Sequence, residues 1–224
     1  MMNMQNILTF LPGIIIGLTA LEYCHALAAH KLGDNTAREM GRMTFNPIKH
    51  IDPIGFIFIL IAGFGWAKPV QFDPENLRNP RRDKAIIAAA GPLSNLILAL
   101  IFIAIVRGWF ALIANAPSFG GDQNVILQIL LSRPFVVFIT IIYYAIMINL
   151  GLFVFNLLPL PPLDGSHIVF SGLNLRPETE HMIMKFRAPL LFIIIIFQNY
   201  SGITILPIRV FISAILRLFM PQLG

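Results

Sequence analysis

Four long apolar stretches constrain the fold of this chain more than any other feature of its sequence. They run from residue 7 to about 32, from 85 to 106, from 135 to 158 and from 188 to about 206. A helix that crosses the hydrocarbon core of a bilayer needs roughly 20 apolar residues, and each stretch approaches or exceeds that length. Only 12% of the 224 residues are charged, about half the fraction of a soluble domain. We therefore expect an all-α polytopic membrane protein.

A fifth apolar segment, residues 52–66, is shorter and contains a proline and three glycines: Pro53, Gly55, Gly63 and Gly65. Such a segment is typical of a re-entrant or β-hairpin element near residues 52–70 rather than of a spanning helix. A short, tilted span is the alternative. We expect about four to six transmembrane helices in a single membrane-embedded domain over residues 1–224.

Basic side chains gather in three loops. Of the 16 Lys and Arg residues, 12 lie there, at positions 31, 38, 42, 49, 68, 78, 81, 82, 84, 176, 185 and 187. Loops rich in Lys and Arg stay on the cytoplasmic side of a membrane. All three lie on one side if the 52–66 segment does not cross, which favours four crossings with the N-terminus outside. The net charge of +5 then reflects membrane topology, and we expect no nucleic-acid partner.

Two acidic residues lie apart from the polar loops. Glu22 is inside the first apolar stretch, and Asp164 follows the third in the segment N-L-L-P-L-P-P-L-D-G, residues 156–165. Ionisable residues at membrane depth are costly and are candidates for function. Prolines prevent a regular helix there, and irregular backbone at this depth needs surrounding protein or a water-filled cavity. The pattern predicts a polar pocket around Asp164.

Residues 21–25 read L-E-Y-C-H, one residue away from H-E-x-x-H. That motif places two histidines on one helix face to bind zinc, with the glutamate as general base. Here Leu21 occupies the position of the first histidine, whereas Glu22 and His25 remain. A carboxylate from a distant segment could complete a three-ligand zinc site with a fourth position open to water. Such a site hydrolyses amides, because zinc acidifies the water and the glutamate takes its proton.

Five segments together resemble the site-2 protease family of intramembrane zinc metalloproteases, in a short form without PDZ or CBS domain. They are E-Y-C-H-A-L-A-A-H-K-L-G-D (22–34), N-P-I-K-H-I-D-P-I-G (46–55), G-F-G-W-A-K-P-V (63–70), A-G-P-L-S-N (90–95) and N-L-L-P-L-P-P-L-D-G (156–165). The resemblance covers most of the chain. It implies a zinc metalloendopeptidase of regulated intramembrane proteolysis, a multi-pass protein of a prokaryotic plasma membrane that cuts transmembrane segments of other proteins.

The resemblance also implies roles for individual residues. His25 and Asp164 would be ligands of Zn²⁺, and Glu22 would be the catalytic base. Other residues would shape or line the substrate cleft, namely Asn156, Pro159, Pro161, Gly63 and Gly65.

Leu21 departs from the family pattern, because leucine cannot ligate a metal and two protein ligands remain instead of three. Three interpretations stay open: an inactivating substitution or sequence change, a natural pseudoprotease that binds transmembrane helices, and a rearranged site with a substitute ligand. The substitutes are His30, turned roughly 140° away from His25 on the helix, His50 and His167. A transporter is a further alternative, but such proteins usually show paired repeats, and none is visible in this sequence.

Overall fold

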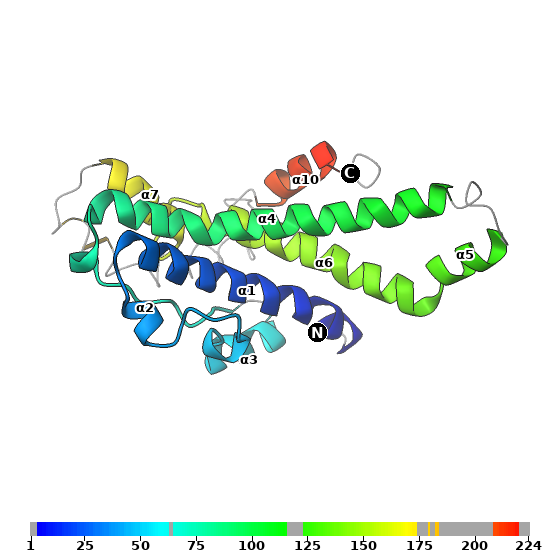
Figure 1. Cartoon of the computed structure of the whole chain (residues 1–224), viewed down its shortest axis with the longest axis horizontal. Coiled ribbons are helices and arrows are strands. Elements are labelled where there is room, and N and C mark those ends of the chain that lie inside the picture. The colour runs from blue at the N-terminus through cyan, green and yellow to red at the C-terminus, as the bar shows by residue number, and fades with distance from the viewer. Residues whose placement is uncertain are drawn as a thin grey trace.

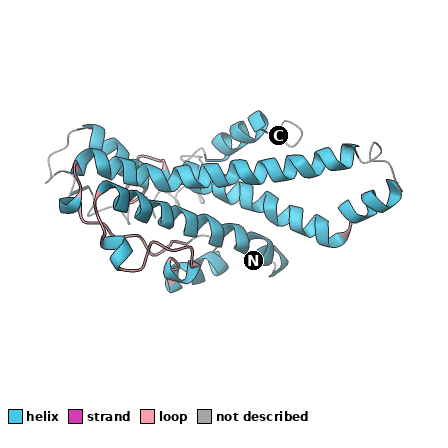
Figure 2. Cartoon of the chain, viewed as in Figure 1, coloured by secondary structure: helices cyan, strands magenta, loops and turns pink. Residues whose placement is uncertain are grey.

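The computed structural model describes residues 4–62, 65–115, 123–173, 179, 182–183 and 208–219. Every named element among these residues is a helix (Figure 2). Three of the helices are long and apolar enough to cross a membrane: α1 (Met4–Leu32), α4 (Pro80–Asn115) and α6 (Arg133–Asn156). The all-α membrane class is confirmed. Three candidate spans are fewer than the four to six expected, and the predicted span over residues 188–206 lies outside the described residues.

The three long helices form an elongated bundle in which α4 packs against both α1 and α6 (Figure 1). Helix α1 approaches α6 through Gly13 and Gly17, which are spaced as G-x-x-x-G. A Cβ on Gly13 would lie 2.8 Å from the Cα of Ala145, and one on Gly17 would lie 2.8 Å from the Leu152 side chain. Small residues at this spacing let two helix backbones pack closely in a membrane, where helices gain little from the hydrophobic effect.

Two buried asparagines link the three helices. The Asn95 side chain in α4 donates to the Gly17 carbonyl in α1 at 2.9 Å and to Asn149 Oδ1 in α6 at 3.0 Å. Asn149 in turn donates to the carbonyl of Ala145 at 2.8 Å. Both asparagines are fully buried, so these hydrogen bonds offset the cost of removing the amides from water.

An apolar core lies where α4, α6 and α10 (Ile208–Phe219) meet. Ile212 and Leu216 of α10 are four residues apart and pack with Ile103, Ile146 and Leu150. In the structure, one face of α10 packs on the bundle.

Helix α4 extends beyond the predicted apolar stretch, 85–106, at both ends. It begins at Pro80, where a fixed φ favours the first turn of a helix. The Asn79 N–H donates to the Asp83 carboxylate at 2.8 Å, which caps this turn. Charged residues limit the part of a helix that can lie in hydrocarbon, but they do not end the helix.

The segment predicted as a re-entrant or β-hairpin element contains a short helix, α3 (Pro53–Ala62). The Gly55 N–H donates to Asp52 Oδ1 at 2.8 Å, an N-cap that starts the helix. The chain then returns in an extended conformation, with an isolated bridge between Ile51 and Ala67. The β-hairpin prediction is therefore wrong for residues 53–62, because a capped apolar run satisfies its backbone locally as a helix.

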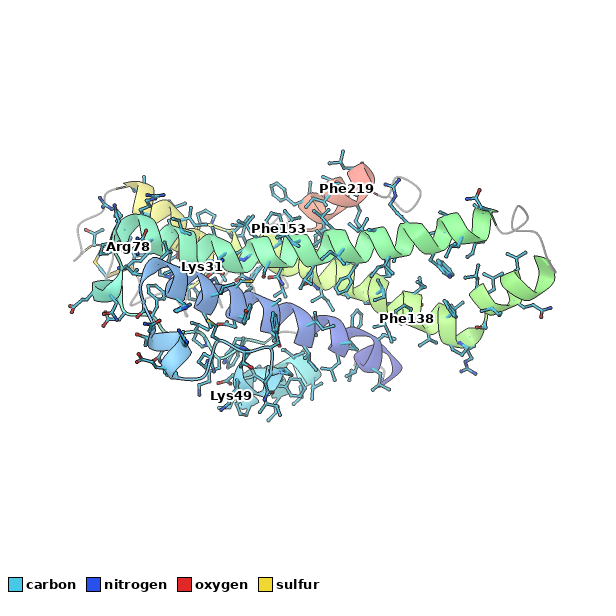
Figure 3. All side chains as sticks on the ribbon, in the orientation of Figure 1. Lys31, Lys49, Arg78, Phe138, Phe153 and Phe219 are labelled. Carbon is cyan, nitrogen blue, oxygen red and sulfur yellow. The ribbon has the colours of Figure 1, made fainter. Side chains whose placement is uncertain are left out.

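Five shorter helices complete the described chain. They are α2 (Thr36–Glu39), the 3₁₀ turns η1 (Pro47–Lys49) and η2 (Pro74–Asn76), α5 (Gln123–Leu130) and α7 (Asp164–Leu173). The first two basic loops lie at the same end of the bundle, where Lys31, Lys49 and Arg78 are labelled in Figure 3.

Candidate metal site

His25 is fixed by a contact with α4. Its Nδ1–H donates to the carbonyl of Ile87 at 2.8 Å. Because a carbonyl can only accept, the proton lies on Nδ1. The other ring nitrogen, Nε2, faces Asp164 Oδ2 at 3.3 Å. Histidines that ligate metals are oriented in the same way, with one ring N–H donated to a carbonyl and the other nitrogen presented to the metal.

Gly91 gives the His25 ring its space. A Cβ on Gly91 would lie 2.3 Å from His25 Nε2 and 2.4 Å from Cε1, too close for any side chain. Ile87 and Gly91 are one turn apart on α4, so they face the same side of that helix. One face of α4 thus both anchors the imidazole and leaves room for it.

The proline-rich turn brings Asp164 to His25. Helix α6 ends at Asn156, and α7 begins with Asp164. A Cβ on Gly165 would lie 2.2 Å from the Leu157 carbonyl oxygen, so the turn folds directly against the first turn of α7. The negative carboxylate stands at the N-terminus of α7, where the helix dipole favours it.

Glu22 is buried beside His25 on α1 and is 6% exposed. Its Oε2 accepts a hydrogen bond from the backbone N–H of Val70 at 2.7 Å. The extended return after α3 therefore passes directly over this carboxylate. Glu22, His25 and Asp164 come from α1 and α7, which the sequence predicted to meet.

The donor set tests whether zinc fits. Two ligands of a tetrahedral zinc ion, each about 2.0–2.1 Å from the metal, lie roughly 3.4 Å apart, and His25 and Asp164 are spaced at 3.3 Å. Leu21, one turn before His25, is 5% exposed and offers no donor. Among the described residues, no three His, Cys, Asp or Glu side chains form a metal-binding group. The pair keeps the spacing of zinc ligands, but the site does not fit a catalytic zinc ion with three protein ligands.

The three substitute histidines do not complete the site among these residues. His30 pairs through Nδ1 with Asn35 Oδ1 at 2.6 Å. His50 is fully buried and donates from Nε2 to the Thr44 carbonyl at 2.7 Å. Burial lowers the pKa of His50 below its usual value. His167 is half-buried on α7.

The predicted cleft residues lie around the same two segments. The Asn156 side chain donates to the Leu152 carbonyl at 3.0 Å at the end of α6. In the turn that follows, Pro161 is buried and Pro159 is exposed. Gly65 packs on α3, because a Cβ there would lie 2.1 Å from the Gly55 carbonyl oxygen. Gly63 lies outside the described residues. A cleft role for these residues stays a prediction.

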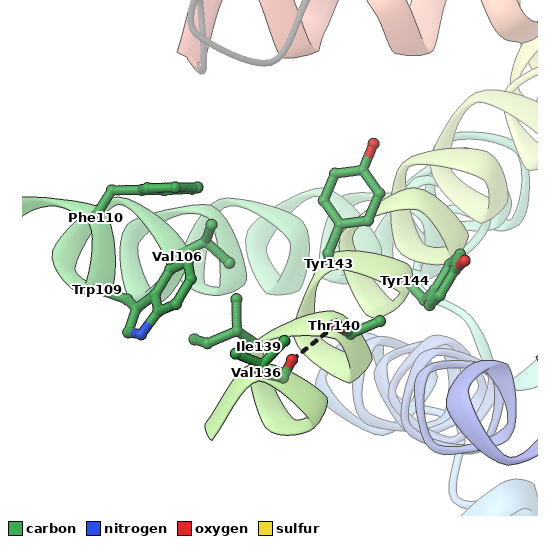
Figure 4. Close-up of a pocket in the computed structure, with 8 residues that line it drawn as sticks. All are labelled: Val106, Trp109, Phe110, Val136, Ile139, Thr140, Tyr143 and Tyr144. Carbon is green, nitrogen blue, oxygen red and sulfur yellow. Dashed lines mark hydrogen bonds between the residues drawn. The ribbon is translucent and has the colours of Figure 1, made fainter. Parts of the chain in front are cut away.

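An apolar pocket of about 250 Å³ lies between α4 and α6, away from these residues (Figure 4). Its lining comes from residues 106–110 and 136–144, including Trp109, Ile139 and Tyr143. It contains no His, Cys, Asp or Glu, so it offers no second candidate for a metal site.

The sequence did not identify three groups that shape the site: the Ile87 carbonyl, Gly91 and the Val70 N–H. Backbone donors and acceptors carry no side-chain signature. Gly91 did have a recognisable signature in the sequence, because a glycine inside an otherwise helical apolar stretch often marks close packing.

Comparison with known proteins agrees with this geometry. Residues 9–196 match peptidase family M50. Two relatives are titled "Putative zinc metalloprotease": YwhC of Bacillus subtilis (strain 168), 43% identical over 70% of this chain, and Rip2 of Mycolicibacterium smegmatis, 26% identical over 77%. The matches cover 65% of YwhC and 60% of Rip2, less than two thirds of either relative. No solved structure matches the chain.

The family match covers most of the chain, including the first ligand segment on α1 and the turn that carries Asp164. The chain therefore belongs to peptidase family M50, the site-2 protease family of zinc-dependent membrane metalloproteases.

Proposed function

We propose that this chain has the architecture of an intramembrane zinc metalloprotease that cuts transmembrane segments of membrane proteins, and that Leu21 strongly impairs its hydrolytic activity. One observation carries the proposal: His25 and Asp164 are at zinc-ligand spacing beside Glu22, and buried Leu21 takes the place of the third donor. His25 and Asp164 would be the remaining ligands, with Glu22 as the base. Asn156, Pro159, Pro161, Gly63 and Gly65 would form the substrate cleft.

The membrane setting belongs to the same proposal. The protein would cross a prokaryotic plasma membrane several times, with residues 188–206 as a fourth span. Helix α3, about 15 Å long, is too short to cross the roughly 30 Å hydrocarbon core. Its exposed Ile54, Ile57, Phe58 and Ile61 would face lipid. The basic loops at one end of the bundle support a cytoplasmic position for the site.

Cleavage of a transmembrane substrate tests the proposal. The unchanged chain, Leu21→His and the double variant Leu21→His with Glu22→Gln are each reconstituted with a membrane-anchored reporter substrate and zinc. We expect cleavage by Leu21→His that a chelator abolishes, and none by the double variant. The unchanged chain should be slower by roughly a hundredfold or more, since loss of even an outer partner of a metal ligand costs ten- to a hundredfold.

The second candidate is a non-catalytic pseudoprotease that binds transmembrane helices. The buried Leu21 favours it, because an apolar side chain at this position leaves a well-packed site that cannot take three-ligand zinc. The experiment separates the two. Inactivity of Leu21→His, with reporter still captured by the unchanged chain, supports the pseudoprotease. Chelator-sensitive cleavage by the unchanged chain at a rate similar to that of Leu21→His contradicts both candidates.

A further inference from the structure

Arg42 is a buried cation in a loop of otherwise exposed basic residues. It is 5% exposed, whereas Arg38 and Lys49 in the same loop are exposed. Its guanidinium donates through Nη1 to the carbonyl of Lys49 and through Nη2 to the carbonyl of Lys68. Nη2 also contacts the Pro69 carbonyl at 3.4 Å. A buried guanidinium is costly unless it is hydrogen-bonded, and here backbone carbonyls serve as its acceptors.

These contacts join two segments that are far apart in the sequence. Arg42 holds the end of its own loop, at Lys49, to the extended return at Lys68 and Pro69. A second contact joins the same two segments, because the Lys68 N–H donates a hydrogen bond to the His50 carbonyl at 2.8 Å. The planar fork of an arginine can reach several carbonyls at once in a fixed geometry.

The residue that follows this clamped segment contacts the proposed base. The Val70 N–H donates to Glu22 Oε2 at 2.7 Å. Val70 follows Pro69 directly, and the ring of Pro69 fixes its own φ. The position of the Val70 amide is therefore determined by Lys68 and Pro69, whose carbonyls Arg42 holds. The amide thus fixes one oxygen of the Glu22 carboxylate, Oε2.

We propose that Arg42 is a positioning residue of the candidate active site: it holds Lys68–Val70 so that the Val70 N–H orients the carboxylate of Glu22. Arg42 touches no reacting group and acts through this segment. The catalytic consequence rests on the proposed function of Glu22. The positioning itself can be measured without any activity.

Amide hydrogen exchange on the purified full-length chain in lipid nanodiscs tests the positioning. We compare Arg42→Gln with Arg38→Gln, a matched loss of an exposed arginine from the same loop. In Arg42→Gln, the hydrogens of the Lys68 and Val70 amides should exchange roughly ten- to a hundredfold faster than in the unchanged chain. This is the range expected for loss of hydrogen bonds to a charged group. The amides of α1, α4 and α6 should stay protected. Arg38→Gln should change none of them.

Two further variants separate the loss of the Val70 hydrogen bond from the loss of the Arg42 contacts. Glu22→Ala removes only the acceptor of the Val70 N–H. It should therefore speed hydrogen exchange at the Val70 amide and leave the Lys68 amide protected. Arg42→Lys should resemble Arg42→Gln, because an ammonium cannot bridge the three carbonyls. Unchanged exchange at Val70 in Arg42→Gln overturns the proposal. Equal acceleration throughout the bundle also overturns it, since that result describes general destabilisation.

The catalytic consequence is measured in the Leu21→His background. Adding Arg42→Gln should lower kcat roughly tenfold or more with little change in KM, because a misoriented base affects the chemical step. Adding Arg38→Gln should change neither. A rise in KM at constant kcat overturns the proposal and assigns Arg42 to substrate binding. If Leu21→His is inactive, the proposed function fails, and the exchange experiment alone still decides whether Arg42 positions the segment.

Discussion

At the scale of single residues, the His25 side chain depends on one face of α4. Ile87 supplies the acceptor for its Nδ1–H, and Gly91 leaves space for the edge of the ring that faces Asp164. Neither residue has a functional group that could act in chemistry. The orientation of the His25 ring on α1 is thus set by the backbone of a neighbouring helix.

Gly91→Ala tests this dependence. The new Cβ would overlap the imidazole, so we expect a loss of roughly 1–3 kcal/mol in the free energy of unfolding, as for other overpacked sites. Gly108→Ala is the matched control in the same helix, because nothing lies within 4 Å of its added Cβ. The control should be neutral or more stable by about 0.5–1 kcal/mol. Denaturant titration in micelles, followed by circular dichroism, measures both, and equal effects would argue against the packing described.

Asp34 is a buried acid with a structural role outside the membrane segment. It accepts hydrogen bonds from the Thr36 hydroxyl at 2.6 Å, the Asn76 amide at 2.9 Å and the N–H of Asp73 at 3.2 Å. Burial alone would raise the pKa of Asp34, but the hydrogen bonds, led by that of Thr36, outweigh it and hold the pKa below its usual value. Asp34 therefore joins the end of α1 to the loop before α4.

The pH dependence follows from the direction of this shift. A carboxyl with a lowered pKa in the folded state stabilises the protein above its unfolded pKa, about 3.9, and this contribution is lost as pH falls through the folded value. Asp34→Asn should therefore cost stability at pH 7, and its difference from the unchanged chain should shrink below about pH 4. Glu75→Gln, an exposed acid nearby, should show little effect at either pH. A constant difference across the range would contradict the assignment.

At the scale of helices, the bundle is joined by the asparagine pair and the glycine contacts of α1. A single side chain, Asn149, both accepts from Asn95 and contacts the face of α1 at Gly17. This arrangement fixes the rotation of each helix about its own axis. The ligand on α1 and the acceptor on α4 consequently face each other.

Asn149→Ala should destabilise the bundle by about 1–2 kcal/mol, the upper range for interhelical hydrogen bonds in membranes. It leaves the Asn95 amide with one acceptor fewer. Asn115→Ala is the control, because that side chain is exposed and, in the part of the chain that the structure describes, it donates within its own helix to the Ala111 carbonyl. The control should change stability by less than about 0.5 kcal/mol. Reversible unfolding in mixed micelles measures both, and the loss of stability should be specific to Asn149.

Sequence patterns predicted the parts of this fold that depend on local composition. Apolar runs located α1, α4 and α6, and the L-E-Y-C-H segment and Asp164 marked residues that the fold brings together. Other features depend on contacts between distant segments. In the sequence, Arg42 looks like any other basic residue of a cytoplasmic loop. Two of the carbonyls that it contacts where it is buried belong to Lys68 and Pro69, 26 and 27 residues later in the sequence. For α3, the short length, the proline and the glycines favoured a re-entrant or β-hairpin element over a helix, whereas Gly55 serves close packing against Trp66.

At the scale of the whole molecule, the chain has the scaffold of a family M50 protease. The family match extends over residues 9–196, and His25 Nε2 lies 3.3 Å from Asp164 Oδ2. In the proposed site, Leu21 stands where a third ligand would be. The proposed function implies that one side chain, Leu21, separates this chain from a complete zinc site.

Zinc content is the most direct test of that claim. The unchanged chain, Leu21→His, and Leu21→His combined with His25→Ala are purified in detergent, equilibrated with micromolar zinc, passed over a desalting column and analysed by mass spectrometry. We expect about one zinc ion per chain for Leu21→His and far less than one for the other two, because a third protein ligand completes the site. One zinc ion per unchanged chain, lost when His25 or Asp164 is replaced by Ala, would contradict it.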